Sequence, residues 1–369
     1  MNKISLDLKT FSNHFAGIGR YTLQLTKELV ARQRFVYLGI TGPQTDHSQL
    51  HGLSDQNQVH VSQQSTVKRS LILPFHLPKD TVLHHSMDNS CIFPWKKKVK
   101  RVTTIHDVLV FLYPEFFTTK HRLIVQGLIQ TAVRWADHII TDSESSKNDI
   151  LRVFPRLASD KVSVTLLAAA PWEGVARDKD LKTSFPDLPE NYLLSVGTIE
   201  PRKNLKRLLA AFENLRKRKK VQDISLVLVG GKGWLDSSLG GDEADLKSKG
   251  IYPLGFVADD LLPQLYKNAT AFVYPAIHEG FGLPVLEAMS CGAPVITSNT
   301  SSLPEVANDA AVYVDPFSVD SIQEAIEKVV SDSELRQEMS RKSKIQSKQF
   351  SWGKTAELTE NVYSKVLGD

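Results

Sequence analysis

Short apolar runs alternate with longer amphipathic stretches along almost the whole chain. Runs such as Ser225–Val229 are nearly continuous in Val and Leu, as expected for strands that are buried on both faces of a parallel sheet. The stretch after Leu205 repeats apolar residues every 3.6 positions and carries Lys and Arg on its other side, which indicates a helix. Alternating β and α elements with short links predict parallel sheets with right-handed crossovers.

The same pattern predicts individual elements. The expected strands are Ile4–Leu8, Phe35–Ile40, Val82–His84, Arg101–Ile105, His138–Thr141, Val162–Thr165, Tyr192–Val196, Ser225–Val229, Ile251–Leu254, Ala271–Tyr274, Pro294–Thr297 and Ala311–Val314. The clearest expected helices are Tyr21–Gln33, Thr119–Trp135, Ser143–Val153, the stretch after Leu205 and a last helix at about Ser351–Leu367. Ser143 is a suitable N-cap for the third of these.

A polar stretch with three prolines and no apolar period, roughly Ala170–Asn191, separates two such halves. We interpret it as an interdomain linker. The predicted fold class is therefore α/β, with two Rossmann-like, doubly wound domains. Residues 1–172 form the first and residues 186–350 the second, and the helix at about 351–369 packs back on the first. Because open α/β sheets bind ligands outside the carboxyl ends of their strands, we expect a ligand cleft between the domains.

Composition narrows the class of protein further. Two cysteines in 369 residues exclude a disulfide scaffold and a cysteine-rich zinc site. No apolar run approaches the roughly 18 residues that a membrane helix needs, and the first residues lack a signal-peptide core, so we expect a cytoplasmic protein. Residues 1–172 carry 21 Lys and Arg against 13 Asp and Glu, a formal charge of +8, whereas residues 173–369 carry −4. The basic residues are scattered without interleaved aromatics, which argues against nucleic acid as a partner.

The most informative motif follows the strand Ala271–Tyr274 and runs from His278 to Ala288. Its glycines allow backbone amides to approach a ligand, and Pro284 suits the first turn of a helix. Glu279 and Glu287 place two carboxylates beside this loop, a combination that suits the recognition of sugar hydroxyls. An isolated pair would more simply be a solvated glutamate and one that complements the helix dipole; the surrounding glycines and proline favour the ligand site.

A second motif, from Ser195 to Asn204, takes a strand through a glycine turn into a helix. Arg202 and Lys203 lie at the mouth of that helix, where cations are unfavourable unless an anion lies between them. An arginine fork and a lysine point charge suit a diphosphate. The simpler interpretation is a solvated basic first turn.

Two weaker candidates lie in the first half. Gly17 and Gly19 follow the first strand without a complete dinucleotide fingerprint; a loop that lines a ligand cleft and an ordinary tight turn are equally compatible with them. His106 follows the strand Arg101–Ile105 and is either a site residue or a buried histidine satisfied by Asp107. No His or Asp lies at metal-ligand spacing from His106, and Asp178-Lys-Asp180 follows no apolar strand, so we expect no metal site.

A cluster of Lys96, Lys97, Lys98, Lys100 and Arg101 beside Trp95 is the last candidate. Such runs are usually solvated loops. The alternative is contact with anionic lipid headgroups.

These motifs together resemble the retaining glycosyltransferases of family four, which have the GT-B fold. The resemblance spans nearly the whole chain and is most specific from Ser195 to Pro316, where Gly230-Gly231-Lys232-Gly233-Trp234 and Leu303-Pro304-Glu305-Val306 also fit. Within the family, the chain looks most similar to bacterial mannosyltransferases that build polysaccharides, including the O-antigen of lipopolysaccharide, from GDP-mannose.

The resemblance implies roles for the residues at matching positions. Arg202 and Lys203 would bind the donor diphosphate, Glu279 the donor sugar and Glu287 the ribose. His106 would lie beside the reacting sugar. Backbone groups would complete the site, those of Phe281, Gly282 and Leu283 around sugar and phosphate, those of Phe256 and Val257 at the base, and Gly17 and Gly19 along the donor cleft.

The implied reaction moves a hexose from a nucleotide-sugar to a hydroxyl of a glycan or polyprenyl-diphosphate-linked acceptor. The anomeric configuration is retained, and neither a cofactor nor a metal is needed. The two cations would stabilise the departing diphosphate. The alternatives are a transferase of the same fold that uses a UDP-, ADP- or dTDP-sugar, a sugar-nucleotide epimerase, and a non-catalytic sugar-nucleotide-binding subunit. The basic first half would meet an anionic membrane as a peripheral protein.

Overall fold

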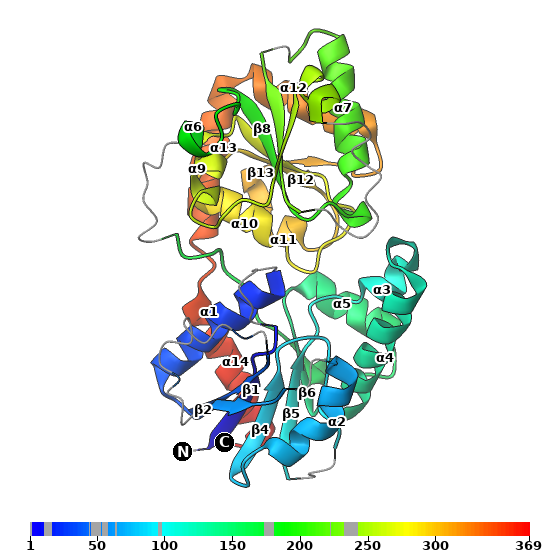
Figure 1. The fold of residues 1–369 in the computed structure, drawn as a ribbon, viewed down its shortest axis with the longest axis vertical. Helices are drawn as coiled ribbons and strands as arrows, with labels where there is room; N and C mark the ends of the chain where they lie inside the picture. The colour runs from blue at the N-terminus through cyan, green and yellow to red at the C-terminus, as the bar shows by residue number, and fades with distance from the viewer. Residues whose placement is uncertain are drawn as a thin grey trace. The chain divides into compact units, whose positions relative to one another are not determined.

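The computed structural model describes residues 2–10, 17–43, 45, 53, 58–62, 65–94, 98–172, 181–221, 223–231 and 243–369. The chain divides into two compact units. The first comprises Met1–Ala168 and Ser351–Asp369, and the second Ala169–Phe350. Each unit is a parallel sheet with helices on both faces (Figure 1).

The first unit contains a seven-stranded sheet in the order β3-β2-β1-β4-β5-β6-β7 among the described residues. Its strands are β1 (Lys3–Asp7), β2 (Val36–Thr41), β3 (Gln58–His60), β4 (Thr81–Ser86), β5 (Lys100–Thr104), β6 (His138–Thr141) and β7 (Val162–Val164). Its helices are α1 (Gly17–Arg32), α2 (Thr66–His76), α3 (Leu109–Leu112), α4 (Thr119–Trp135), α5 (Glu144–Val153) and α14 (Trp352–Leu367), with short 3₁₀ turns η3 (Pro114–Phe116) and η4 (Ser159–Lys161).

The second unit repeats this architecture with a six-stranded sheet in the order β10-β9-β8-β11-β12-β13. Its strands are β8 (Tyr192–Val196), β9 (Ser225–Val229), β10 (Ile251–Gly255), β11 (Ala271–Tyr274), β12 (Val295–Ser298) and β13 (Ala311–Val314). Its helices are α6 (Leu181–Ser184), α7 (Leu205–Lys217), α8 (Glu243–Ser248), α9 (Leu262–Asn268), α10 (Leu283–Ser290), α11 (Leu303–Ala307), α12 (Val319–Ser331) and α13 (Ser333–Ser347), with turns η5 (Pro201–Lys203) and η6 (Asn308–Ala310).

Both sheets confirm the predicted fold class, because each is parallel and doubly wound. The strand order reverses between β1 and β4 in the first unit and between β8 and β11 in the second. In such sheets the connections from these two central strands leave on opposite faces, which opens a crevice at their carboxyl ends. The fold therefore singles out the segments that follow β8 and β11 as the place for a ligand in the second unit.

The core of the second unit forms where the sequence indicated it. Leu208 and Phe212 lie on the apolar side of α7 and are completely buried, as are Leu226 of β9 and Val273 of β11. Ser143 caps α5 as predicted, since its side chain accepts a hydrogen bond from the Ser146 amide.

The last helix, α14, belongs to the first unit. Its Glu360 is fully buried and accepts hydrogen bonds from the Arg32 guanidinium at 2.8 Å and from the Tyr37 hydroxyl at 3.0 Å. Tyr363 hydrogen-bonds to His85 of β4 at 2.7 Å. A buried carboxylate with two donors holds the C-terminal segment against α1 and β2.

The predicted linker is wrong over its later part. The second unit begins at Ala169, and Leu181 of α6 and Leu188 are buried in it. Two isolated leucines among polar residues give no apolar period, so the sequence pattern did not predict that they are buried. Residues 173–180, which include Asp178 and Asp180, lie outside the described part of the chain. None of the described helices is both long and apolar enough to span a bilayer.

Candidate functional site

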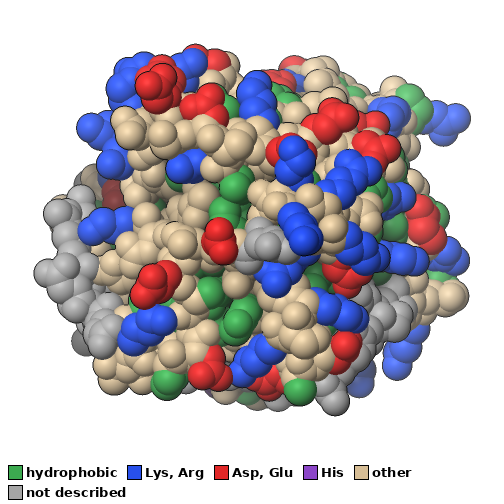
Figure 2. Space-filling view, turned by 90° about the horizontal axis from the view of Figure 1, so that it is seen from above, with side chains coloured by type: hydrophobic (Ala, Val, Ile, Leu, Met, Phe, Trp, Pro, Cys, Tyr) green, Lys and Arg blue, Asp and Glu red, His purple; other side chains and the backbone are tan. Residues whose placement is uncertain are grey.

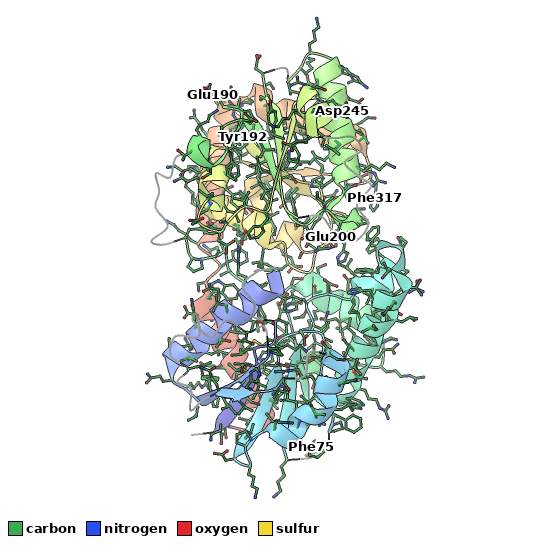
Figure 3. All side chains as sticks on the ribbon, in the orientation of Figure 1. Phe75, Glu190, Tyr192, Glu200, Asp245 and Phe317 are labelled. Atoms are coloured by element: carbon green, nitrogen blue, oxygen red, sulfur yellow. The ribbon has the colours of Figure 1, made fainter. Side chains whose placement is uncertain are left out.

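The two strongest motifs of the sequence meet at the reversal point of the second sheet. Turn η5 follows β8 and carries Arg202 and Lys203, and the segment after β11 carries Glu279. The amide of Ile277 donates a 2.8 Å hydrogen bond to the carbonyl of Arg202 and joins these two segments. Figure 3 labels Tyr192, the first residue of β8, and Glu200, which follows the carboxyl end of this strand.

Arg202, Lys203 and Glu279 form a single charged cluster. One guanidinium nitrogen of Arg202 lies 2.6 Å from Glu279 Oε2 and the other lies 2.7 Å from Glu200 Oε1. Lys203 Nζ lies 2.6 Å from Glu279 Oε1. The Tyr274 hydroxyl donates to the same Oε1 at 2.8 Å and accepts a hydrogen bond from Lys203 Nζ. The formal charges of these side chains therefore cancel.

Burial makes this cluster unlike a surface ion network. Only 5% of the Glu200 side chain and 8% of the Glu279 side chain are exposed, whereas Arg202 exposes 22%. Burial opposes a charge on Glu279, but Arg202 and Lys203 outweigh it and lower the pKa of this carboxyl to about 2. Burial, reinforced by Glu279, raises the pKa of Tyr274 well above its usual range. The phenol is thus a neutral hydrogen-bond donor beside a charged carboxylate.

The loop that carries Glu279 is fixed by three consecutive hydroxyl side chains. Thr300 Oγ1 donates to the Ile277 carbonyl at 3.0 Å, and Ser301 Oγ accepts from the Glu279 amide at 3.0 Å. Ser302 Oγ lies 3.0 Å from the Glu279 carbonyl and 2.8 Å from that of Phe281. The backbone is therefore held on both sides of the carboxylate.

Helix α10 begins directly after this loop, as the motif predicts. Gly282 is its N-cap and adopts a left-handed conformation with φ 103°, which glycine adopts without strain. Pro284 lies in the first turn. Leu283 starts the helix, so its amide and that of Gly282 have no intrahelical acceptor, whereas the Val285 and Leu286 amides donate to the Gly282 carbonyl. Hydroxyls and phosphates are suitable ligands for such amides.

Glu287 lies on α10, and Phe256 and Val257, the predicted contacts of the nucleotide base, follow the carboxyl end of a strand of the same sheet. Glu287 is buried, with 4% exposed, and accepts a hydrogen bond of 3.3 Å from the Tyr266 hydroxyl. It is therefore not a solvated helix residue. Phe256 and Val257 follow the carboxyl end of β10; Phe256 is 67% exposed and Val257 is buried.

Asn204 is a further residue that the sequence did not single out. Its backbone is left-handed, with φ 62° and ψ 28°, and its side chain is 3% exposed. The amide nitrogen donates to the carbonyls of Pro275 at 2.9 Å and Pro316 at 2.6 Å. Asn204 thus connects the end of η5 to the segments that follow β11 and β13.

In the first unit, His106 is paired with Asp142 and not with Asp107. His106 Nδ1 lies 2.6 Å from Asp142 Oδ2, and Nε2 lies 3.2 Å from the Met87 carbonyl. Both partners accept hydrogen bonds, so both ring nitrogens must carry hydrogens. Burial alone would lower the pKa of His106, but the Asp142 carboxylate outweighs it and raises the pKa to about 9. Asp107 instead accepts a hydrogen bond from the Leu109 amide at the start of α3.

The expectation of a loop at Gly17 and Gly19 is wrong in its geometry. Both glycines lie in the first turns of α1, which begins at Gly17. Residues 20–30 of this helix are all buried or partly buried, and Tyr21 packs its ring edge-on against His106 at a centroid distance of 4.9 Å. The helix thus starts earlier than its apolar period indicated, because glycine contributes nothing to that period.

The basic cluster of the first unit is partly neutralised. Lys98 and Lys100 are exposed, but Arg101 pairs with Asp137 at 3.2 Å, and Lys100 lies 4.0 Å from the same carboxylate. Trp95, Lys96 and Lys97 lie outside the described residues. No group of three or more His, Cys, Asp or Glu that could hold a metal ion occurs within the described ranges.

Comparison with known proteins relates these features to a family. The model for group 1 glycosyl transferases matches residues 176–346. The chain is 31% identical to O-antigen chain mannosyltransferase B of Escherichia coli over 364 residues, which cover 94% of this chain and 95% of that protein. It is 32% identical over 292 residues to the serotype-specific mannosyltransferase WbdA of Escherichia coli, and these residues cover 74% of this chain but only 34% of WbdA.

A solved structure resembles the fold over its whole length. Sucrose-phosphate synthase from Thermosynechococcus elongatus aligns with a TM-score of 0.76 at 18% identity, and the alignment covers 100% of both chains. At this identity the likeness concerns the fold, and it confirms an architecture of two Rossmann-like domains.

Proposed function

The chain belongs to the group 1 glycosyltransferases, and from this premise we propose that it transfers mannose from GDP-mannose to a hydroxyl of a glycan or lipid-linked acceptor. The transfer would retain the anomeric configuration and serve polysaccharide synthesis. The observation that carries the proposal is the buried cluster of Arg202, Lys203 and Glu279 at the reversal point of the second sheet. The mannosyltransferase names of the two Escherichia coli relatives support the choice of sugar.

Each residue of the cluster has a part in this proposal. Arg202 and Lys203 bind the two phosphates of the donor, Glu279 contacts hydroxyls of the donor sugar, and Glu287 holds the ribose. Amides of Phe281, Gly282 and Leu283 surround the sugar and phosphate, and the backbone at Phe256 and Val257 meets the base. The location supports the assignment, because ligands of doubly wound sheets bind where the strand order reverses.

In the proposed reaction, the bond between the sugar C1 and the diphosphate oxygen breaks while the acceptor oxygen forms a bond to C1. The acceptor proton passes to an oxygen of the departing diphosphate on the same face, so no separate carboxylate base is needed. Arg202 and Lys203 stabilise the negative charge that grows on the diphosphate. These fixed cations would take the place of a divalent metal.

His106 has a supporting role in the proposal. As a doubly protonated ring it presents positive charge and no lone pair, so it does not act as a general base. Its partners Asp142 and Met87 fix the ring. We assign it to the neighbourhood of the reacting sugar, together with Gly17 and Gly19 at the start of α1.

A thermal-shift panel followed by product analysis tests the proposal. A donor that binds only the native state raises its melting temperature, so GDP-mannose is expected to give a larger shift than UDP-, ADP- or dTDP-sugars. Incubation with GDP-mannose and a mannan acceptor should then yield an α-linked product and GDP. A larger shift with another nucleotide-sugar would refute the choice of donor. A new sugar nucleotide formed without acceptor would indicate an epimerase, and binding without any turnover would indicate a binding subunit.

We further propose that the first unit meets a polyprenyl-diphosphate-linked acceptor at the cytoplasmic surface of an anionic membrane. Helix α2 contains no acidic residue and exposes Val67 by 50%, Leu71 by 41% and Phe75 by 66%. These side chains recur every fourth residue and therefore lie on one side of the helix. Lys68 on α2 and the exposed Lys98 supply positive charge. On the face that Figure 2 shows, by contrast, acidic and basic side chains are interspersed.

A further inference from the structure

The cations that would bind the diphosphate already have counter-charges inside the protein. Arg202 contacts both Glu200 and Glu279, and Lys203 contacts Glu279. An anion that arrives at this cluster must therefore replace carboxylate contacts that exist without it. This observation concerns the same site as the proposed function, on which the following inference rests.

We propose that Glu279 competes with the donor diphosphate for Arg202 and Lys203, and that Tyr274 is the positioning residue that retains Glu279 when the diphosphate takes the two cations. The Glu279 carboxylate then leaves its internal ion pairs and accepts hydrogen bonds from the hydroxyls of the donor sugar. The two roles of the carboxylate are successive, and the hydroxyl of Tyr274 is the contact common to both.

The exposure of the cluster sets the direction of the exchange. The Arg202 side chain is 22% exposed, whereas those of Glu279 and Glu200 are 8% and 5% exposed. An incoming anion therefore contacts the Arg202 guanidinium first, because the carboxylates of Glu200 and Glu279 are more deeply buried. A diphosphate that shares the cations with Glu279 brings like charges close together, which favours the displacement of the carboxylate.

Tyr274 is suited to retain the Glu279 carboxylate, because its hydroxyl is neutral. The diphosphate therefore competes with Glu279 for the two cations but not for this hydroxyl. The phenol donates to Glu279 Oε1 at 2.8 Å. Its ring is fully buried at the end of β11 and stacks on Phe272 with a centroid distance of 5.6 Å and an angle of 19°. The ring therefore stays in place when Lys203 turns to the phosphate.

The backbone around Glu279 is equally fixed. Ser301 and Ser302 hold the amide and carbonyl of Glu279, and Ile277 is tied to the Arg202 carbonyl. The exchange is thus a rotation of side chains, with the loop in place. Tyr274 limits that rotation, so that the freed carboxylate remains directed at the sugar.

Two substitutions separate competition from positioning. Glu279→Gln removes the competing charge at nearly constant shape, so isothermal titration calorimetry should show GDP and UDP binding at least about 10-fold more tightly than to the wild-type chain, although turnover falls. Tyr274→Phe removes only the hydroxyl. It should lower kcat about 10-fold, with KM for the nucleotide-sugar and the affinity for GDP changed less than about 3-fold.

Tyr192→Phe is the matched control for Tyr274→Phe. Tyr192 is also a buried sheet tyrosine, at the amino end of β8, whereas the cluster follows the carboxyl end. Its hydroxyl donates a 2.9 Å hydrogen bond to the Leu265 carbonyl of α9. Tyr192→Phe loses one buried hydrogen bond, and Tyr274→Phe loses those to Glu279 and from Lys203. Both variants should lower the melting temperature, but only Tyr274→Phe should lower kcat. Equal kcat in the two variants overturns the positioning role of Tyr274.

Weaker or unchanged binding of GDP and UDP to Glu279→Gln overturns the competition. Failure of the proposed function has a different signature. In that case the wild-type chain binds no nucleoside diphosphate, or binds it as tightly after Lys203→Ala as before.

Discussion

Removal of one cation from the cluster is the most direct perturbation of the proposed donor site. In Lys203→Ala, Glu279 still has the Tyr274 hydroxyl on Oε1 and Arg202 on Oε2, so it is not left as an unpaired buried charge. In Arg202→Ala, Glu279 keeps Lys203 and Tyr274, whereas Glu200 loses its ion pair with the guanidinium. Both variants are therefore expected to fold. Each lost charge-assisted contact costs about 1–3 kcal/mol, or roughly 2–4 °C in melting temperature for each kcal/mol in a unit of this size. Arg202→Ala loses the contacts to both Glu200 and Glu279 and is therefore expected to be less stable than Lys203→Ala.

The effect on catalysis is larger than the effect on stability. With Arg202 and Lys203 present, the two carboxylates are balanced; with one cation removed, the cluster has a formal charge of −1 and faces the diphosphate. Two unit charges 4 Å apart interact by about 4 kcal/mol at an effective dielectric constant of about 20. Loss of a single electrostatic stabiliser typically costs about 10²- to 10³-fold in turnover. We therefore expect each alanine variant to lose at least roughly 10²-fold in kcat.

The assay is release of nucleoside diphosphate from GDP-mannose in the presence of acceptor, on protein whose fold is checked by circular dichroism. Arg202→Lys retains the charge without the fork and should lose less activity than Arg202→Ala. Lys249→Ala and Arg341→Ala are matched controls, because each removes an exposed ion pair, with Asp245 at 2.8 Å and Glu338 at 2.7 Å, respectively. Activity near that of the wild type in both Arg202→Ala and Lys203→Ala would refute the assignment of the diphosphate to this cluster.

Four further predictions concern other parts of the proposal. Glu287→Gln should weaken GDP binding about 10-fold with little change of kcat at saturating donor, since a ribose contact persists through the reaction; unchanged affinity in calorimetry contradicts the ribose role. Turnover should survive EDTA, and its loss with rescue by Mg²⁺ or Mn²⁺ would exclude a metal-independent mechanism. Because the pKa of His106 is raised from 6.5 to about 9, its pairing with Asp142 contributes about 3 kcal/mol that is present below pH 6.5 and lost as pH rises through 9; urea unfolding from pH 6 to 9.5 should show this slope, and an equal slope in Asp142→Asn argues against it. Replacement of Lys96–Lys98 by Gln should reduce co-sedimentation with anionic liposomes at low salt and leave GDP binding intact, and equal recovery of the wild-type chain with neutral and anionic vesicles excludes the membrane contact.

The strands were accessible from the sequence because a parallel sheet buries both faces of its central strands. His138–Thr141, Tyr192–Val196, Ser225–Val229, Ala271–Tyr274 and Ala311–Val314 have the predicted bounds. Helix α2 was not predicted, although Ser65 caps it. Pro74 lies inside this helix, and its apolar residues are divided between a buried and an exposed side, so neither proline rules nor a single apolar face identified it.

The sequence predicted which residues belong to the site but not which of them contact one another. Glycines, a proline and charged residues after the predicted strands indicated where a ligand binds. That Glu279 pairs with Lys203, which is 76 positions away, follows only from the neighbouring positions of β8 and β11. Tyr274 was hidden because it completes an apolar strand. His106 was paired with Asp107 by adjacency, whereas the register of β5 and β6 places Asp142 beside it.

The reversal points of the two sheets carry similar charges with different consequences. Asp7 ends β1 and Asp88 follows β4 in the first unit, with Lys9 at 2.9 Å from Asp88 and Arg69 at 3.0 Å from Asp7. Arg69 is 1% exposed and also donates to the carbonyls of Val61, Ile40 and Thr41. Its guanidinium is therefore committed to fixed acceptors and inaccessible to an anion. Because Arg202 at the equivalent point of the second sheet is 22% exposed and held by carboxylates that a diphosphate can replace, the same topology gives a structural charge cluster in the first unit and a candidate donor site in the second.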